Sequence, residues 1–264
     1  MSRFVVRRGD WDATYYHSPQ RTGQRKADSS DDETRRRLAW TMRRLRELGF
    51  VDDDRFDWAR FLDYRERVHE NFFNFWTAIN PPVEALLYAI SWVVRPRRVL
   101  GVGVHTGNPI AWSLGPALDG VYEADWLAGV EIDPNCARLA KMNFDQISPG
   151  RVEVLAEDGF DVLERLQPVS LDLLYLDAAG YDPPARSKIS RGRAGGKNVN
   201  YLLLKVAVEK MKPGGVVLCH NAYQPSFQRQ AADYLAFTSD ERFFERTATL
   251  GIDEMGLEFS IVAG

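Results

Sequence analysis

The second half of the chain alternates between short apolar runs and segments of helical length, and this alternation limits the fold more than any other feature. Apolar runs of strand length lie at residues 98–104, 128–132, 151–155, 171–176 and 216–219. They are rich in Val, Leu and Ile with little polar alternation, as expected for parallel strands buried on both faces. The pattern predicts an α/β fold built on a doubly wound sheet with right-handed crossovers.

Two more apolar runs lie near the end of the chain, around residues 247–250 and 257–262. Only a short segment containing Gly251 and Gly256 separates them, which favours an antiparallel hairpin at the edge of the sheet. With the runs before them they predict a mostly parallel, seven-stranded sheet.

The sequence before Pro96 has a different character. Residues 1–50 contain twelve Lys and Arg against seven Asp and Glu, so we interpret residues 1–33 as a basic polar arm. Residues 34–95 are dense in aromatics, many of them at helical spacing as in Trp58, Phe61 and Tyr64. Such rings are mainly core or interface. We therefore expect a helical cap or a dimerisation segment there, and the main α/β domain at residues 96–264.

Composition excludes several classes of protein. A net charge of −3 over 264 residues gives no reason to expect a nucleic-acid partner. The two cysteines are too few for a disulfide framework. The longest nearly apolar run, residues 83–94, is shorter than the roughly 20 residues that span a bilayer. We expect a cytoplasmic protein that acts on a small molecule, with no membrane partner.

A glycine-rich turn follows the first predicted strand of the main domain. It contains Gly101, Gly103, His105, Thr106 and Gly107. Ligands of open α/β sheets bind beyond the carboxyl ends of the strands, and glycines let the backbone approach a ligand closely. A dinucleotide fingerprint would place its third glycine at position 106, which is threonine here. The turn therefore predicts a ligand site of a different kind.

Acidic residues follow the next two predicted strands. Glu131 is placed to accept both hydroxyls of a ribose, because a carboxylate offers two acceptor oxygens. After the third strand come Asp158, Gly159 and Phe160. We expect an acidic or backbone group there to meet an adenine amino group, with the Phe160 ring packed on the base.

The fourth and fifth strands end in the residues best suited to proton chemistry. Asp177 is the main candidate for an acid, a base or an amine-orienting group, because a buried strand end tunes a carboxylate. His220, beside Asn221, is either a general base or a structural histidine. Tyr181 begins a basic segment, residues 181–200, that is either a solvated loop or a lid over an anionic ligand.

Taken in order, the motifs VLGVGVHTG, GVEIDP, AEDGF, LLYLDA and MKPGGVVL resemble the class I S-adenosylmethionine-dependent methyltransferases. Within them they resemble the small O-methyltransferases of the catechol and caffeoyl-coenzyme A type. The resemblance implies strand order 3-2-1-4-5-7-6 and S-adenosylmethionine as cofactor. It also implies that Gly101, Gly103 and Gly107 flank the methionine part of the cofactor, that Glu131 holds the ribose and that Asp158 faces the adenine.

One departure from the catechol-type pattern concerns the metal ion. Those enzymes hold a divalent cation with an aspartate after the fourth strand and an Asp-Asn pair after the fifth. Here the positions are Asp177 and the pair His220 and Asn221. Magnesium prefers oxygen ligands, so the sequence predicts no magnesium site, and a softer transition metal is the alternative.

Three functions are consistent with these residues. The default is methyl transfer from S-adenosylmethionine to a hydroxyl or amine of a small molecule, with Asp177 or His220 as base and Tyr181 near the reacting groups. In the second, the cofactor is itself the substrate and cyclises to azetidine-2-carboxylate with release of methylthioadenosine. The third is a non-catalytic cofactor-binding protein. A homodimer through the aromatic helices is an accompanying expectation.

Overall fold

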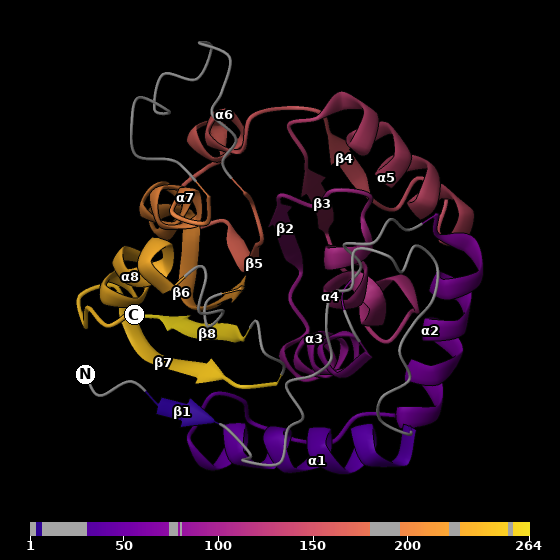
Figure 1. The fold of residues 1–264 in the computed structure, drawn as a ribbon, viewed down its shortest axis with the longest axis horizontal. Helices are drawn as coiled ribbons and strands as arrows, with labels where there is room; N and C mark the ends of the chain where they lie inside the picture. The colour runs from indigo at the N-terminus through magenta and orange to yellow at the C-terminus, as the bar shows by residue number, and fades with distance from the viewer. Residues whose placement is uncertain are drawn as a thin grey trace.

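The centre of the molecule is a single eight-stranded sheet with helices on both faces (Figure 1). This computed structural model describes residues 4–6, 31–73, 79, 81–179, 196–221, 228–252 and 256–264. The strands are β1 (Phe4–Val6), β2 (Arg98–Val102), β3 (Trp126–Val130), β4 (Glu153–Leu155), β5 (Leu171–Leu176), β6 (Met211–His220), β7 (Phe244–Leu250) and β8 (Leu257–Val262).

The strand order across the sheet is β1-β7-β8-β6-β5-β2-β3-β4. Neighbours pair in parallel, except that β8 is antiparallel to both β6 and β7. From β2 onward this is the order that the sequence motifs implied, and the antiparallel hairpin of β7 and β8 is confirmed. Parallel strands β2, β3 and β5 therefore present their carboxyl ends at one edge of the sheet.

The seven predicted strands, β2 to β8, are all present in the sheet. An additional strand, β1, pairs in parallel with β7 and places Val6 opposite Leu250. No periodic pattern predicts β1, because it consists of only three residues inside a basic polar segment. Pairing with β1 satisfies backbone groups along the outer side of β7 that an edge strand would leave open.

The helices cover the two faces in separate groups. They are α1 (Asp31–Glu47), α2 (Trp58–Asn71), α3 (Pro81–Val94), α4 (Asn108–Leu118), α5 (Pro134–Ile147), α6 (Gly159–Arg165), α7 (Val199–Ala207) and α8 (Gln228–Phe237). Figure 1 shows α6, α7 and α8 on one side of the sheet and the others on the opposite side. Each group closes its own hydrophobic core against the sheet.

Aromatic rings of α2, α3 and α4 form the middle of the core on the α3–α4 side. Phe61, Tyr64, Tyr88 and Trp112 are each at most 1% exposed. The ring centroids of Phe61 and Tyr88 are 5.3 Å apart, and those of Tyr64 and Trp112 are 6.1 Å apart. Full burial of such a side chain contributes roughly 1.5–3 kcal/mol. The prediction that the N-terminal aromatics are mainly core is confirmed for Phe61, Tyr64 and Tyr88, whereas Phe73 is 61% exposed.

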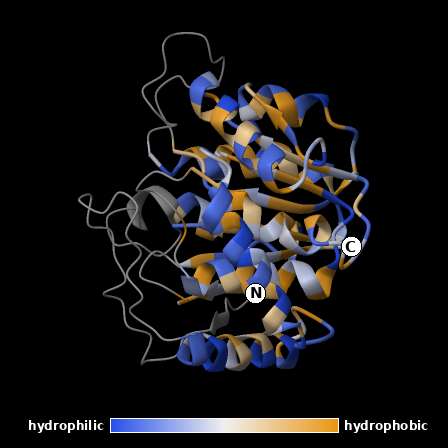
Figure 2. Ribbon diagram, turned by 90° about the vertical axis from the view of Figure 1, so that its right-hand side faces the viewer, coloured by the Kyte–Doolittle hydropathy of each residue, from blue (hydrophilic) through white to orange (hydrophobic). Residues whose placement is uncertain are grey.

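Hydropathy separates the buried sheet from the outermost helix. Figure 2 shows the strands in the middle mostly hydrophobic and α1, at the bottom, mainly hydrophilic. The outer helix α1 contributes one apolar stripe, which includes Leu38, Met42 and Leu45, to the core. Within the described ranges, no helix combines the length and the apolar content that a membrane span requires.

Candidate active site

The glycine-rich turn after β2 lies against the end of β5. A Cβ added at Gly103, whose φ is +80°, would come within 2.5 Å of the backbone nitrogen of Ala178. Glycine is thus required at position 103 both by the left-handed backbone conformation and by the close approach of the chain that follows β5. Gly101 leaves room for Ile110 of α4, and Gly107, at φ +92°, lies under the ring of Phe144. These two glycines serve the packing and capping of α4.

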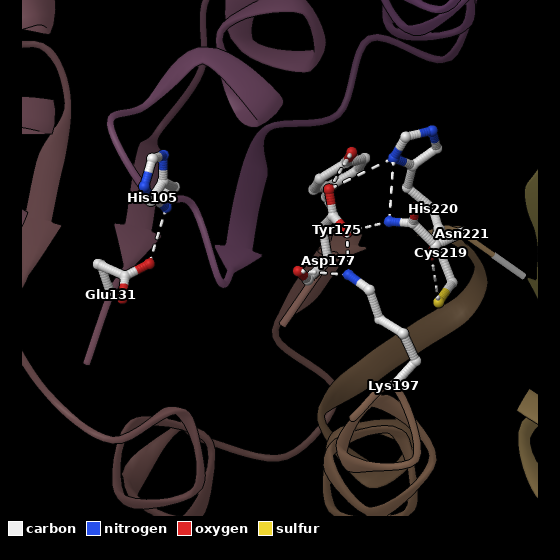
Figure 3. Close-up of polar contacts among 8 residues, drawn as sticks. All are labelled: His105, Glu131, Tyr175, Asp177, Lys197, Cys219, His220 and Asn221. Atoms are coloured by element: carbon white, nitrogen blue, oxygen red, sulfur yellow. Dashed lines mark hydrogen bonds and ion pairs between the residues drawn. The ribbon is translucent and has the colours of Figure 1, made fainter. Parts of the chain in front are cut away.

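Glu131, at the end of β3, holds this turn in place. Its Oε2 accepts a hydrogen bond from the backbone N–H of His105 at 2.7 Å, and its Oε1 accepts one from the N–H of Asp133 at 3.0 Å. Figure 3 shows Glu131 and His105 together, apart from the other polar residues of the site. Each carboxylate oxygen has further lone pairs, so Glu131 can hold the turn and still accept ribose hydroxyls.

The other residues predicted to bind the cofactor near this turn are mostly engaged in contacts within the protein. Thr106 is buried, and its carbonyl oxygen accepts from the side chain of Asn143 at 2.8 Å. Asp158 caps α6, with its Oδ1 accepting from the N–H of Phe160 at 3.0 Å. Phe160 is only 7% exposed and belongs to the core on the α6–α8 side. Gly159 lies close against Val102.

Asp177, directly after β5, is the centre of a second polar cluster. The Lys197 ammonium donates to Asp177 Oδ1 at 2.6 Å and to the Asp177 carbonyl oxygen at 3.1 Å. The Asn221 side-chain amide donates to the same Oδ1 at 2.7 Å. Nδ1 of His220 lies 3.4 Å from Asp177 Oδ2, and the Tyr175 hydroxyl lies 3.5 Å from that oxygen. Figure 3 shows these side chains converging on one carboxylate.

The ionisation of Asp177 is set by two opposing effects. Burial alone would raise its pKa, but the positive charge of Lys197 and the interaction with His220 outweigh it, so the pKa falls well below its ordinary value. The side chains of Asp177, Lys197 and His220 are 11%, 10% and 8% exposed. Asp177 is therefore a fixed anion at neutral pH and not itself a proton acceptor.

Backbone geometry at the end of β6 directs His220 and Asn221 toward Asp177. Asn221 has a φ of 65°, a left-handed conformation that asparagine tolerates better than most residues. Nδ1 of His220 faces both the Asp177 carboxylate and, at 3.3 Å, the Asn221 side-chain nitrogen. In the tautomer with its proton on Nδ1, His220 donates to Asp177 and carries its lone pair on Nε2. In Figure 3, Nε2 lies on the side of the ring away from Asp177. This arrangement suits His220 to take a proton.

Lys197 is the residue that sequence reasoning did not place in the site. The sequence places it in the basic segment 181–200, interpreted as either a solvated loop or a lid, whereas it is buried just before α7 and bonded to Asp177. The available signal was its position just before a helix that follows β5, at the same edge of the sheet as Asp177. Tyr181, the remaining predicted catalytic residue, lies outside the described residues.

The donor set does not fit a divalent metal ion. Asp177 Oδ1 already faces the Lys197 ammonium at 2.6 Å, and the second carboxylate of the catechol-type pattern is the imidazole of His220. Among the described residues, no three His, Cys, Asp or Glu side chains are grouped so as to hold a metal. A cation between Asp177 and Asn221 would have to displace the ammonium.

Comparison with solved structures identifies the fold. An O-methyltransferase from Bacillus cereus in complex with SAH aligns with a TM-score of 0.54 at 15% identity, over 84% of this chain and 97% of that one. The O-methyltransferase TomG from Streptomyces achromogenes, in complex with SAM, aligns with a TM-score of 0.55 at 17% identity, over 87% of this chain and 98% of that one.

The chain has the class I methyltransferase fold. The resemblance indicated by the sequence motifs is confirmed at this level. A protein of Mycolicibacterium vanbaalenii named "Putative O-methyltransferase" is 29% identical over 147 residues, 55% of this chain and 56% of that protein. A protein of Mycobacterium leprae with the same type of name is 37% identical over 111 residues, 41% of this chain and 47% of that protein. No protein-family model matches the chain.

The chain thus spans about half the length of the curated relatives that it matches.

Proposed function

We propose that this protein is an S-adenosylmethionine-dependent methyltransferase that methylates a hydroxyl or amine of a small molecule without a magnesium ion. The observation that carries the proposal is that two polar clusters lie at the same edge of the sheet. One contains Glu131, a carboxylate placed to accept ribose hydroxyls, and the other contains Asp177 and His220, which can handle a proton. The names of the curated relatives and the SAM- and SAH-bound structural neighbours support the same reaction class.

The residues present fit the cofactor. Gly103 brings the turn close to the end of β5, and we assign the methionine part of the cofactor to the backbone of this turn. Glu131 accepts the ribose hydroxyls, and the region of Asp158 and Gly159 faces the adenine. Bound there, S-adenosylmethionine supplies a methyl carbon made electrophilic by the adjoining sulfonium.

His220 is the general base of the proposed reaction. Its imidazole takes the proton of the acceptor while Asp177 fixes the ring and stabilises the imidazolium that forms. Bound S-adenosylmethionine would supply the methyl group to the acceptor atom, and the electron pair of its broken carbon–sulfur bond would stay on sulfur. The 2.7 Å hydrogen bond that Asn221 donates fixes the position of the Asp177 carboxylate.

A small acceptor is favoured by the depth of the cluster, because side chains only 8–11% exposed are poorly accessible to a rigid polymer. A homodimer through the aromatic helices and a cytoplasmic location remain predictions from the sequence.

The deciding experiment is mass spectrometry of the products after incubation of the protein with S-adenosylmethionine, with and without a panel of phenols and amines. S-adenosylhomocysteine formed only with an acceptor is the expected result. Methylthioadenosine formed without any acceptor would replace methyl transfer by cyclisation to azetidine-2-carboxylate. Tight cofactor binding with no product would make the protein a non-catalytic binder. Activity must persist in EDTA, and its loss there would contradict the metal-independent mechanism.

A further inference from the structure

We propose that the Lys197 ammonium is a built-in cation that takes the position and the electrostatic role of the divalent metal ion in catechol-type enzymes. The inference rests on the proposed function for its catalytic part, but its structural part stands on the contacts of Asp177 alone.

The first argument is position. Lys197 Nζ lies 2.6 Å from Asp177 Oδ1, and Asn221 donates to the same oxygen at 2.7 Å. Asp177 and Asn221 are two of the three residues at the positions that carry the cation in the catechol-type pattern. The ammonium therefore lies beside the oxygen on which a metal ion at these positions would depend.

The second argument is charge balance. A divalent ion with two carboxylates is formally neutral, and so is an ammonium with one carboxylate. Replacing one aspartate by His220 removes one negative charge, and replacing the metal by Lys197 removes one positive charge. The two departures compensate each other, since a buried cluster with uncompensated charge is costly. They are best explained as one coupled change of the site.

The third argument concerns the acceptor. A cation beside the reacting atoms stabilises an oxygen nucleophile as its proton leaves, and it repels a protonated amine. Lys197 does this by its charge, without replacing the hydrogen bonds that it donates to Asp177. The inference therefore narrows the acceptor class to compounds with an ionisable hydroxyl, such as phenols.

The structural part is tested by titration of MnCl2 into three proteins by calorimetry: the wild type, His220→Asp, and Lys197→Met with His220→Asp. The double variant restores the two carboxylates and removes the ammonium. It should bind Mn²⁺ roughly tenfold or more tightly than either of the others. The single variant is the matched control, because it has both carboxylates but retains the internal cation.

Equal Mn²⁺ affinity of His220→Asp and the double variant would overturn the proposal, because the ammonium would then not occupy the cation position. Wild-type binding that is lost in Asp177→Asn would overturn it as well, as would a double variant that binds no better than wild type. If the double variant is too unstable for calorimetry, MnCl2 must raise its Tm and leave the wild-type Tm unchanged. A Tm that does not respond to MnCl2 counts against the proposal.

The catalytic part is tested with Lys197→Met and Lys197→Arg in the product assay. Loss of the charge should lower kcat roughly 100-fold with the KM for S-adenosylmethionine little changed. Lys197→Arg should recover a substantial part of kcat, which a purely space-filling role does not predict. Equal loss in both variants would overturn the catalytic role. A wild type without methyl transfer would instead defeat the proposed function and leave the Mn²⁺ result standing.

Discussion

The two carboxylates at the sheet edge, Glu131 and Asp177, are held in opposite ways. Glu131 accepts from backbone N–H groups of His105 and Asp133, which carry no net charge. Asp177 faces an ammonium, an imidazole and an amide, so its environment is dense in charge. The first arrangement positions a loop and leaves acceptor capacity for a ligand. The second fixes an anion and orders the lysine, histidine and asparagine side chains around it. A carboxylate at a strand end therefore acquires its role from its partners.

The largest effect that we expect is the loss of stability in Asp177→Ala, which removes the carboxylate held by charged partners. This change leaves the Lys197 ammonium buried without its partner, so we expect the free energy of unfolding to fall by about 3–5 kcal/mol. Urea denaturation followed by circular dichroism measures it. The control is the neutral pair Asp177→Asn with Lys197→Met, which should recover most of the loss. A double variant as unstable as Asp177→Ala would show that the ion pair is not the cause.

Gly103→Ala should push the glycine-rich turn, which Glu131 holds, away from the end of β5, where Asp177 lies. The new Cβ meets the backbone of Ala178, while Gly214, with a similar φ of +74°, has nothing within 4 Å. Gly214→Ala is therefore a control for backbone strain alone. We expect Gly103→Ala to lower the free energy of unfolding by roughly 1–3 kcal/mol more than Gly214→Ala does. Equal losses would mean that the turn yields easily.

Glu131→Ala tests the carboxylate that is held only by uncharged backbone N–H groups. Loss of its hydrogen bonds should weaken S-adenosylmethionine binding by roughly 1–3 kcal/mol in calorimetry. Glu153→Ala is a suitable control, because this exposed carboxylate contacts the indole of Trp126 away from the turn. An unchanged affinity in Glu131→Ala would refute the ribose assignment.

The smallest effect we expect is in the acid range, where the depressed pKa of Asp177 links stability to protonation. The stabilisation is fully present above its unfolded value near 3.8 and is lost as pH falls from there through the folded pKa. One such group changes the free energy of unfolding by at most about 1.4 kcal/mol per pH unit. Denaturation between pH 4 and 2 should show a shallower decline in Asp177→Asn with Lys197→Met than in wild type. Identical slopes would assign acid sensitivity to other carboxylates.

The sequence predicted the positions of Glu131, Asp177, His220 and Asn221 because each lies at or just after the end of a strand that an apolar run reveals. Their assembly follows from the parallel sheet, which brings strand ends together whatever their separation in the chain. Lys197 did not follow from this rule, because it precedes a helix and lies inside a basic polar segment. Nor did β1, whose three residues form strand only by pairing with β7.

Local pattern by itself therefore determined the order of strands and helices and which side chains reach the ligand edge. Only the tertiary structure decided what each of those side chains faces. Hydrophobic periodicity is written into neighbouring residues, whereas the partner of a buried charge is chosen by the three-dimensional packing around it. For Asp177 that partner is an ammonium twenty residues further along the chain, and it gives this site a cation of its own.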